Sequence, residues 1–181
     1  MKTILLDVDG VLADCNKAVY QAARKMFNRK IPHYSTWDKY AFEDSMKLTR
    51  SEKEYFYKTL ARKNNVGNQI NFYPGAQAFV EHLGFGNKVV FCTAPWRGLE
   101  HWCEARYTLL EHYLGRRNYS IVLTHDKHLI QGDWLVDDKW ENIEKNLERG
   151  VLFAQPWNTS AHKAANFVAS NYTEVLKIVE G

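Results

Sequence analysis

Cysteine is scarce in this sequence, with three residues in 181, namely Cys15, Cys92 and Cys103. Their number is odd, and their spacing matches neither a Cys-x-x-Cys pair nor a zinc site. This pattern argues against a disulfide framework and favours the reducing environment of the cytoplasm. We therefore expect a cytoplasmic protein.

Long apolar runs and blocks of one charge are also missing. No run approaches the ~20 apolar residues that a membrane-spanning helix needs, and the short run after Lys2 meets Asp7, which fits a first strand better than a signal peptide. No block of Lys and Arg exceeds two residues, and the net charge is +3. Such a charge would attract small anions but does not indicate a stable nucleic-acid complex, and we expect no membrane partner.

Short apolar runs, by contrast, recur along the chain. Apolar residues make up 45% of the sequence, as in ordinary globular proteins, and the length suits one domain. Five runs are continuous rather than alternating, which is typical of strands buried on both faces of a parallel sheet. These runs are residues 3–6, 88–92, 120–123, 134–136 and 151–154. Helical stretches separate most of them, so we predict a three-layer, Rossmann-like α/β fold.

The predicted helices are marked by proline and glycine. Pro74 stands at an expected first helical position, and Gly84, Gly115 and Gly150 stand at expected ends. The predicted core helices cover residues 76–83, 99–114, 140–149, 160–169 and 173–179.

One connection is too long for a simple crossover between strand and helix. It covers residues 14–72 and contains a predicted helix at 16–27 and a second helix beginning near Thr49. Thr49 and Glu52 have the spacing of a capping box. We predict a small helical cap at 14–72, inserted after the first strand into a core formed by residues 1–13 and 73–181.

Polar residues follow four of the apolar runs. They lie in the segments Asp7-Val8-Asp9-Gly10, Thr93-Ala94-Pro95, Thr124-His125-Asp126-Lys127 and Asp137-Asp138. Ligands of open parallel sheets bind outside the carboxyl ends of the strands. The four segments therefore predict one site that combines carboxylates, a hydroxyl and an ammonium group.

The acidic residues of this edge indicate a metal. Asp7 and Asp9 are two residues apart, so on an extended backbone their side chains would point the same way, and Gly10 permits a sharp turn after them. Several carboxylates at one edge repel one another unless a hard cation neutralises them, and Mg²⁺ with oxygen ligands fits. Taken alone, the pair could also be ordinary turn or capping residues. An EF-hand is excluded because its other ligands are not at the required offsets.

The ordered set of segments resembles the four motifs of the haloacid dehalogenase-like (HAD) phosphatase superfamily. Those motifs are an Asp-x-Asp-Gly after a strand, a strand that ends in Thr or Ser, a lysine, and an acidic pair after a strand. The matching segments are Asp7-Val8-Asp9-Gly10-Val11-Leu12, Val89-Val90-Phe91-Cys92-Thr93, Lys127 and Leu135-Val136-Asp137-Asp138. Together they span residues 3 to about 140.

Within that superfamily the chain is similar to the 5′(3′)-deoxyribonucleotidases. The similarity lies in Cys92-Thr93-Ala94-Pro95, in Asp126-Lys127, in residues 132–138 and in the Asp-Val-Asp-Gly-Val-Leu-Ala-Asp segment that begins at Asp7. The insertion also falls where that family carries its helical cap. Cys15 stands where the family commonly has a phenylalanine that contacts the base.

The resemblance implies a role for each acidic residue. Asp7 would attack phosphorus and become an aspartyl phosphate, which divides a difficult hydrolysis into two displacements. Asp9 would protonate the departing alkoxide, deprotonate the hydrolytic water, and give its backbone carbonyl to the metal. Asp138 is our first choice for the remaining metal ligand and Asp137 the second, because neighbouring residues at a strand end are expected to point to opposite sides.

The resemblance also implies the phosphate contacts. The Thr93 hydroxyl, Lys127 and Arg97 would bind the phosphoryl group. Each could instead be structural: Thr93 as a strand-end residue, Lys127 as a solvated loop lysine, and Arg97 as the start of a surface helix. Four aromatic residues of the insertion could stack on a base or form the interior of the cap, and they are Tyr34, Trp37, Tyr40 and Phe42. Trp157 could line the pocket, although packing is the expected role.

The sequence thus predicts a Mg²⁺-dependent phosphatase that releases the 5′-phosphate of (deoxy)ribonucleoside monophosphates. One alternative is a HAD phosphatase that acts on another small phosphoester, such as a sugar phosphate or a nucleic-acid 3′-phosphate. A non-catalytic binding module on the same fold is the other alternative, and it is disfavoured because every motif position is intact.

Overall fold

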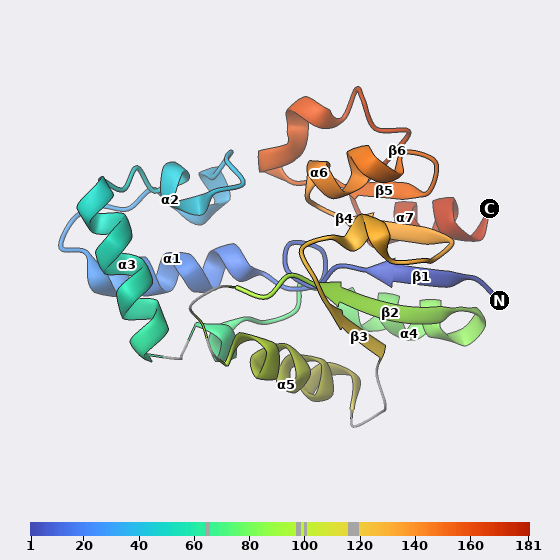
Figure 1. The fold of residues 1–181 in the computed structure, drawn as a ribbon, viewed down its shortest axis with the longest axis horizontal. Coiled ribbons are helices and arrows are strands. Elements are labelled where there is room, and N and C mark those ends of the chain that lie inside the picture. Colours follow the sequence, from blue (N-terminus) through green and yellow to red (C-terminus); the bar gives the residue numbers. More distant parts are fainter. Residues whose placement is uncertain (64–65, 97–98, 100, 116–119) are drawn as a thin grey trace.

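A six-stranded parallel sheet organises the chain (Figure 1). The computed structural model describes residues 1–63, 66–96, 99, 101–115 and 120–181. The strand order is β3-β2-β1-β4-β5-β6. The strands are β1 (Thr3–Leu6), β2 (Lys88–Thr93), β3 (Ser120–Leu123), β4 (Trp134–Asp137), β5 (Gly150–Phe153) and β6 (Phe167–Ala169). All five predicted runs are strands, with ends that differ from the prediction by at most one residue.

Helices cover both faces of this sheet. The helices are α1 (Cys15–Met26), α2 (Phe42–Ser45), α3 (Arg50–Lys63), α4 (Ala76–Gly86), α5 (Trp102–Leu114), α6 (Trp140–Ile143) and α7 (Tyr172–Glu180). Because side chains alternate along a strand, Ile4 and Leu6 pack with α4, α5 and α7, whereas Leu5 packs with Ile143 of α6 on the opposite face. The predicted three-layer α/β fold is confirmed.

The C-terminal part of the chain differs from the prediction. Residues 160–169 were expected to be helical, but β6 lies there and extends the sheet by one edge strand, with the Ala154 N–H donating to the Ala169 carbonyl at 2.8 Å. An apolar segment this short has no period that distinguishes a strand from a helix, and only its pairing with β5 decides.

Two helix ends were also wrong. α4 continues through Gly84 to Gly86 and begins only after Gly75, whose φ of 84° marks the turn into the helix. α6 ends at Ile143, is followed by a short 3₁₀ turn, and leaves Gly150 to begin β5 rather than to end a helix. Helix boundaries depend on packing and capping contacts that one glycine does not determine.

The long connection forms a helical unit beside the sheet (Figure 1). Its predicted first helix is α1, and the predicted capping box is confirmed, since the Glu52 N–H donates to the Thr49 hydroxyl at 3.3 Å and the Thr49 N–H donates to Glu52 at 2.8 Å. Where this unit meets the core, two backbone segments pair, with Asp14 N–H donating to the Asn71 carbonyl at 2.9 Å. The boundaries of the cap at residues 14 and 72 remain a prediction.

The order of the strands places a crevice at the centre of the sheet. β1 pairs with β2 on one side and with β4 on the other, and the connections that extend the sheet run outward from β1 and from β4 in opposite directions. In such sheets the ligand site lies outside the carboxyl ends of the strands at that switch point. Asp7 follows β1 directly, and Asp137 is the last residue of β4.

Candidate active site

The loop after β1 forms the floor of the site. The Asp7 N–H donates to the Val136 carbonyl at 3.0 Å, which continues the contact of β1 with β4 beyond the strand. Gly10 has a φ of 87°, and a Cβ there would collide with the carboxylate of Asp138. Gln155 donates to the Gly10 carbonyl at 2.6 Å. Glycine is therefore required both by the turn and by the close approach of Asp138.

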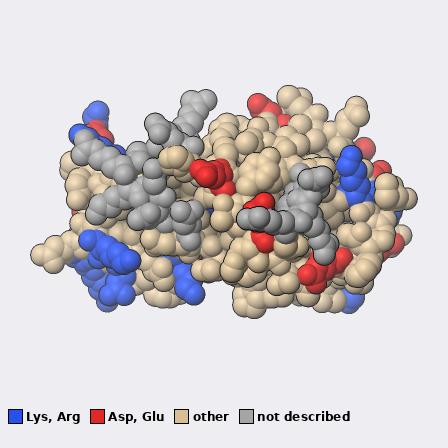
Figure 2. Space-filling model, turned by 90° about the horizontal axis from the view of Figure 1, so that it is seen from below, with Lys and Arg blue, Asp and Glu red and all other residues tan. Residues whose placement is uncertain are grey.

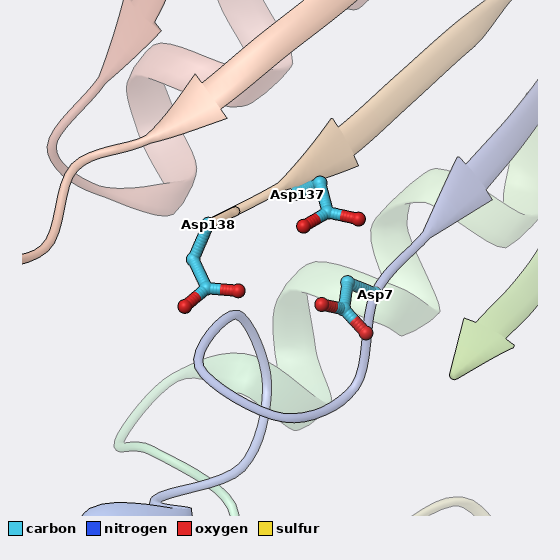
Figure 3. A group of neighbouring side chains, drawn as sticks. All are labelled: Asp7, Asp137 and Asp138. Atoms are coloured by element: carbon cyan, nitrogen blue, oxygen red, sulfur yellow. The ribbon is translucent and has the colours of Figure 1, made fainter. Parts of the chain in front are cut away.

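Three carboxylates converge above this loop (Figure 3). Asp7, Asp137 and Asp138 each place an oxygen within 4.8 Å of the others, and all three side chains are buried. The expectation that Asp137 and Asp138 point to opposite sides is wrong. β4 ends at Asp137, so the backbone at Asp138 no longer has to follow the alternation of a strand.

A buried lysine lies among these carboxylates. Lys127 is 3% exposed, and its Nζ lies 2.7 Å from Asp7 Oδ1 and 2.8 Å from Asp137 Oδ2. Burial alone would lower the pKa of Lys127, but Asp137 and Asp7 raise it above its ordinary value, so the ammonium group stays charged. The structure thus excludes the alternative of a solvated loop lysine.

Negative charge nevertheless exceeds positive charge in this group. Burial raises the pKa of Asp7 well above its ordinary value, and repulsion from Asp137 and Asp138 raises it further. Burial, followed by repulsion from Asp137, raises the pKa of Asp138 to about 7. Three carboxylates share one ammonium group, and the donor set is all oxygen apart from that lysine. A hard divalent cation fits these residues.

Asp137 and Asp138 differ in their hydrogen bonds. Both oxygens of Asp137 accept protein donors, Oδ2 from Lys127 and from Asn142 at 2.9 Å, and Oδ1 from the Lys139 N–H at 2.8 Å. Asp138 Oδ2 accepts from the indole N–H of Trp157 at 2.8 Å. Both carboxylate oxygens of Asp137 therefore already accept hydrogen bonds within the protein, whereas Asp138 has more of its carboxylate available to a ligand.

Asp9 lies apart from the three converging carboxylates. Its Oδ2 is 3.4 Å from the Thr93 hydroxyl, which donates to it, and 3.4 Å from Arg106 Nε. The chain turns directly after Asp7, so the side chains of Asp7 and Asp9 do not share the alternation of a continuing strand. Both residues still line the same pocket, together with Thr93.

The pocket has a volume of about 460 Å³, which lies within the range of small-molecule sites. Its core side carries the polar residues described above together with Trp96, Trp102 and Trp157, and the side formed by the predicted cap carries three aromatic residues. The cap residues that line it include Tyr40, Ala41, Phe42, Glu43 and Tyr57. Of the four aromatic residues named from the sequence, Tyr40 and Phe42 line the pocket, whereas Trp37 is fully buried and Tyr34 packs against Tyr20.

Other candidate residues fall in different places. Arg97 lies outside the described residues. Trp157 lines the pocket and binds Asp138, so its role exceeds the packing that was expected. Sequence reasoning missed Arg106, a fully buried residue beside Asp9. A signal existed, because Arg106 lies at helical spacing within the buried stripe of Trp102, Ala105, Leu109 and Leu110.

On the face in Figure 2, the coloured Lys and Arg side chains form separate groups, the largest at the cap end, and no continuous basic band crosses the visible described residues. None of the helices formed by the described residues has the length and apolar character that crossing a bilayer requires.

Comparison of sequences identifies relatives along the whole chain. The family model described as "5′ nucleotidase, deoxy (pyrimidine), cytosolic type C protein" matches residues 1–180. A protein of Bordetella parapertussis, named as a proposed 5′(3′)-deoxyribonucleotidase, is 33% identical over 96% of this chain and 94% of its own length. The human cytosolic-type 5′(3′)-deoxyribonucleotidase is 30% identical over 75% of this chain and 70% of its own length.

Solved structures share the fold. A haloacid dehalogenase-like hydrolase from Streptococcus pneumoniae superimposes with a TM-score of 0.67 at 15% identity, over 99% of this chain and 98% of that protein. A HAD family hydrolase from Deinococcus radiodurans, solved with bound phosphate and sodium, gives a TM-score of 0.64 at 14% identity, over 99% of this chain and 96% of that protein. The predicted HAD-like fold is confirmed.

Proposed function

Since the chain belongs to the 5′ nucleotidase, deoxy (pyrimidine), cytosolic type C family, we propose that it is a Mg²⁺-dependent phosphatase that removes the 5′-phosphate of (deoxy)ribonucleoside monophosphates. One observation carries this proposal. A group of buried carboxylates with a charged lysine lies at the floor of a pocket whose opposite wall is aromatic. The floor suits a phosphate and a cation, and the aromatic wall suits a nucleobase.

The reaction proceeds in two displacements at phosphorus. In the first, a carboxylate oxygen of Asp7 attacks phosphorus, the bond from phosphorus to the 5′-oxygen breaks, and Asp9 gives its proton to that oxygen. Nucleoside leaves, and Asp7 carries the phosphoryl group. In the second, water attacks the same phosphorus while Asp9 takes a proton from it, and the bond to Asp7 breaks. Inorganic phosphate leaves, and both carboxyl groups return to their first state.

Mg²⁺ would be held by Asp7, by Asp138 and by the backbone carbonyl of Asp9, with Asp137 as the second choice for the carboxylate ligand. When bound, the cation supplies positive charge that offsets the repulsion between the nucleophile and the phosphate. The choice of Asp138 is supported by the hydrogen bonds of Asp137, whose oxygens both already accept protein donors.

Three further residues bind the phosphoryl group in this proposal. Lys127 holds the Asp7 carboxylate in place and lies close enough to neutralise charge on a phosphoryl oxygen. Thr93 lines the pocket beside Asp9 and contributes its hydroxyl. Arg97 remains a prediction, as a basic contact to the phosphate.

The cap, proposed to be residues 14–72, determines which leaving group is accepted. Tyr40 and Phe42 line the pocket from this side and offer aromatic faces to a base.

All three cysteines are free thiols in the structure, and a cytoplasmic location remains a prediction.

Phosphate release from a panel of nucleoside monophosphates, sugar phosphates and a 3′-phosphorylated oligonucleotide, in Mg²⁺ and in EDTA, tests the proposal. Preferred hydrolysis of nucleoside 5′-monophosphates that EDTA abolishes is the expected result. Preference for another phosphoester would retain a phosphatase but overturn the nucleotide substrate. Absence of turnover on every monoester in Mg²⁺ would leave a binding module.

A further inference from the structure

Arg106 of α5 is a buried cation beside the reaction site. Its side chain is 0% exposed, and its guanidinium lies 4.1 Å from the ring centre of Trp102. Burying a charge is costly unless it is paired, so a fully buried arginine requires a partner. Arg106 does not line the pocket itself, whereas Trp102 does.

Among the described residues, the carboxylate of Asp9 lies within ion-pair distance of Arg106. The distance between Arg106 Nε and Asp9 Oδ2 is 3.4 Å. Four buried polar atoms of this pair have no hydrogen-bond partner among the described residues, namely Asp9 Oδ1 and the three guanidinium nitrogens of Arg106. The unpaired donors of Arg106 and the unpaired acceptor of Asp9 therefore belong to two side chains that are already in contact. A small rotation would bring them toward the bidentate arrangement that arginine and carboxylates favour.

Arg149 shows what a structural arginine looks like in the same protein. Its guanidinium donates to the carbonyls of Gly132 at 2.8 Å and of Ile130 at 2.9 Å, and to the side chain of Asn146. These bonds hold backbone segments together at the end of the sheet remote from Asp7. Arg106 makes no such bond to a carbonyl in the described part of the chain, so tying backbone segments together does not explain its burial.

We infer that Arg106 is a positioning residue that holds the Asp9 carboxylate for proton transfer to and from the reacting oxygens. This inference rests on the proposed function, in which Asp9 is the general acid and base. Trp102 covers the face of the guanidinium, and the Thr93 hydroxyl contacts the same oxygen of Asp9 as Arg106 does. Asp9 is therefore held from the core side by two groups, while the pocket remains open on its other side.

A positioning role for proton transfer predicts dependence on the leaving group. A nucleoside 5′-oxygen leaves as a poor alkoxide and needs a proton, whereas 4-nitrophenolate is a stable anion that leaves without one. Loss of Arg106 would therefore slow the first displacement for alkyl phosphates and spare it for 4-nitrophenyl phosphate. The second displacement, in which Asp9 accepts a proton from water, would slow for both.

The experiment compares kcat/KM for 4-nitrophenyl phosphate with kcat/KM for the alkyl phosphate that the wild-type protein hydrolyses best in the panel above. For Arg106→Met we expect a loss of roughly 30-fold or more on the alkyl ester, since general acid catalysis contributes about 10²–10⁴-fold, and a loss within about 3-fold on the aryl ester. A burst of 4-nitrophenol should appear, because hydrolysis of the aspartyl phosphate becomes limiting. Arg106→Lys, which keeps the charge, should restore part of the selective loss.

Arg149→Met is the matched control, and it should lower the melting temperature without any leaving-group selectivity. In an Asp9→Asn background, Arg106→Met should add no further selectivity, because residues that act through one another are not additive. Equal losses on both esters in Arg106→Met, or failure of both Arg106 variants to fold, would make Arg106 purely structural and overturn the inference. If Asp9→Asn itself lacks the selective loss, the proposed acid role of Asp9 fails, which is a different result.

Discussion

The two walls of the pocket differ in their buried charges, which lie on the core wall. The core wall consists of short polar contacts between buried charges, such as the 2.7 Å and 2.8 Å bonds from Lys127 to Asp7 and Asp137. The wall formed by the predicted cap carries aromatic side chains such as Tyr40 and Phe42, and Phe42 packs against Trp96 of the core wall. Tyr40 is 55% exposed, whereas Asp137 is fully buried.

From this contrast we expect the core wall to serve the chemistry and the cap wall to serve substrate selectivity. Buried charges fix their neighbours strongly, because an unpaired charge in a low dielectric is costly, and so they suit steps that need defined geometry. Aromatic faces bind many flat ligands with little directional demand. Changes to the core wall should therefore alter turnover and metal binding, whereas changes to the cap wall should alter substrate affinity.

Asp7→Asn should have the largest effect. Removing a covalent nucleophile should lower kcat by at least about 10⁴-fold. Asp7→Asn loses the ion pair with Lys127, but burial and repulsion from Asp137 and Asp138 outweigh that pair, because they leave the pKa of Asp7 well above its ordinary value. The melting temperature should therefore stay the same or rise. Steady-state kinetics and thermal unfolding check both outcomes. Retained turnover would exclude Asp7 as the nucleophile.

The acidic pair should divide into two functions. Asp138→Asn should weaken Mg²⁺ binding by at least about tenfold in calorimetry, because one anionic ligand is lost. Asp137→Asn should chiefly destabilise the fold, because Asp137 pairs with buried Lys127 and also accepts hydrogen bonds from Asn142 and the Lys139 N–H. The cost should stay below the about 3–5 kcal/mol of a fully broken buried pair, because Lys127 keeps its contact with Asp7. If Asp137→Asn instead abolishes Mg²⁺ binding with an unchanged melting temperature, the second choice of ligand is the correct one.

On the cap wall, Tyr40→Ala should raise KM for nucleoside monophosphates by about 5- to 150-fold, because stacking on an aromatic ring contributes about 1–3 kcal/mol per base. We expect kcat to change little, and glycerol phosphate, which has no base, to be unaffected. Tyr55→Ala is the control, since Tyr55 is 53% exposed on α3 and does not line the pocket. A fall in kcat without a rise in KM would contradict the separation of the two walls.

The smallest effect concerns stability and pH in the metal-free protein. The pKa of Asp138 is about 7 in the folded protein, above its ordinary value of 3.8, so the folded state binds more protons than the unfolded chain between these values. The associated stability is present below the lower value and is lost as pH rises through about 7. In EDTA the melting temperature should fall by a few degrees between about pH 5.5 and 8, at about 2–4 °C per kcal/mol for a chain of this size.

Two controls accompany this measurement. Asp138→Asn should flatten the pH dependence, and Mg²⁺ should reduce the fall by stabilising the ionised carboxylates. A melting temperature that rises with pH in EDTA, in the wild-type protein, would contradict the raised pKa of this residue.

The sequence by itself determined five of the six strands in the described sheet and the residues at their carboxyl ends. Continuous apolar runs such as residues 3–6 are typical of strands buried in a parallel sheet, and the order of Asp7, Thr93, Lys127 and Asp138 along the chain supports the proposed chemistry. Such signals are local, because each depends on a few consecutive side chains. The short edge strand β6 lacked such a signal, because its pairing with β5 is a long-range contact.

Only the tertiary structure decided how these side chains meet. Asp137 and Asp138 converge with Asp7, and their hydrogen bonds differ because Lys127, Asn142 and Lys139 donate to Asp137. Arg106 beside Asp9 and the aromatic wall of the cap likewise became visible only in three dimensions. The physical reason is that burial, repulsion and ion pairing depend on distances between residues far apart in the chain, which the spacing of a motif does not contain.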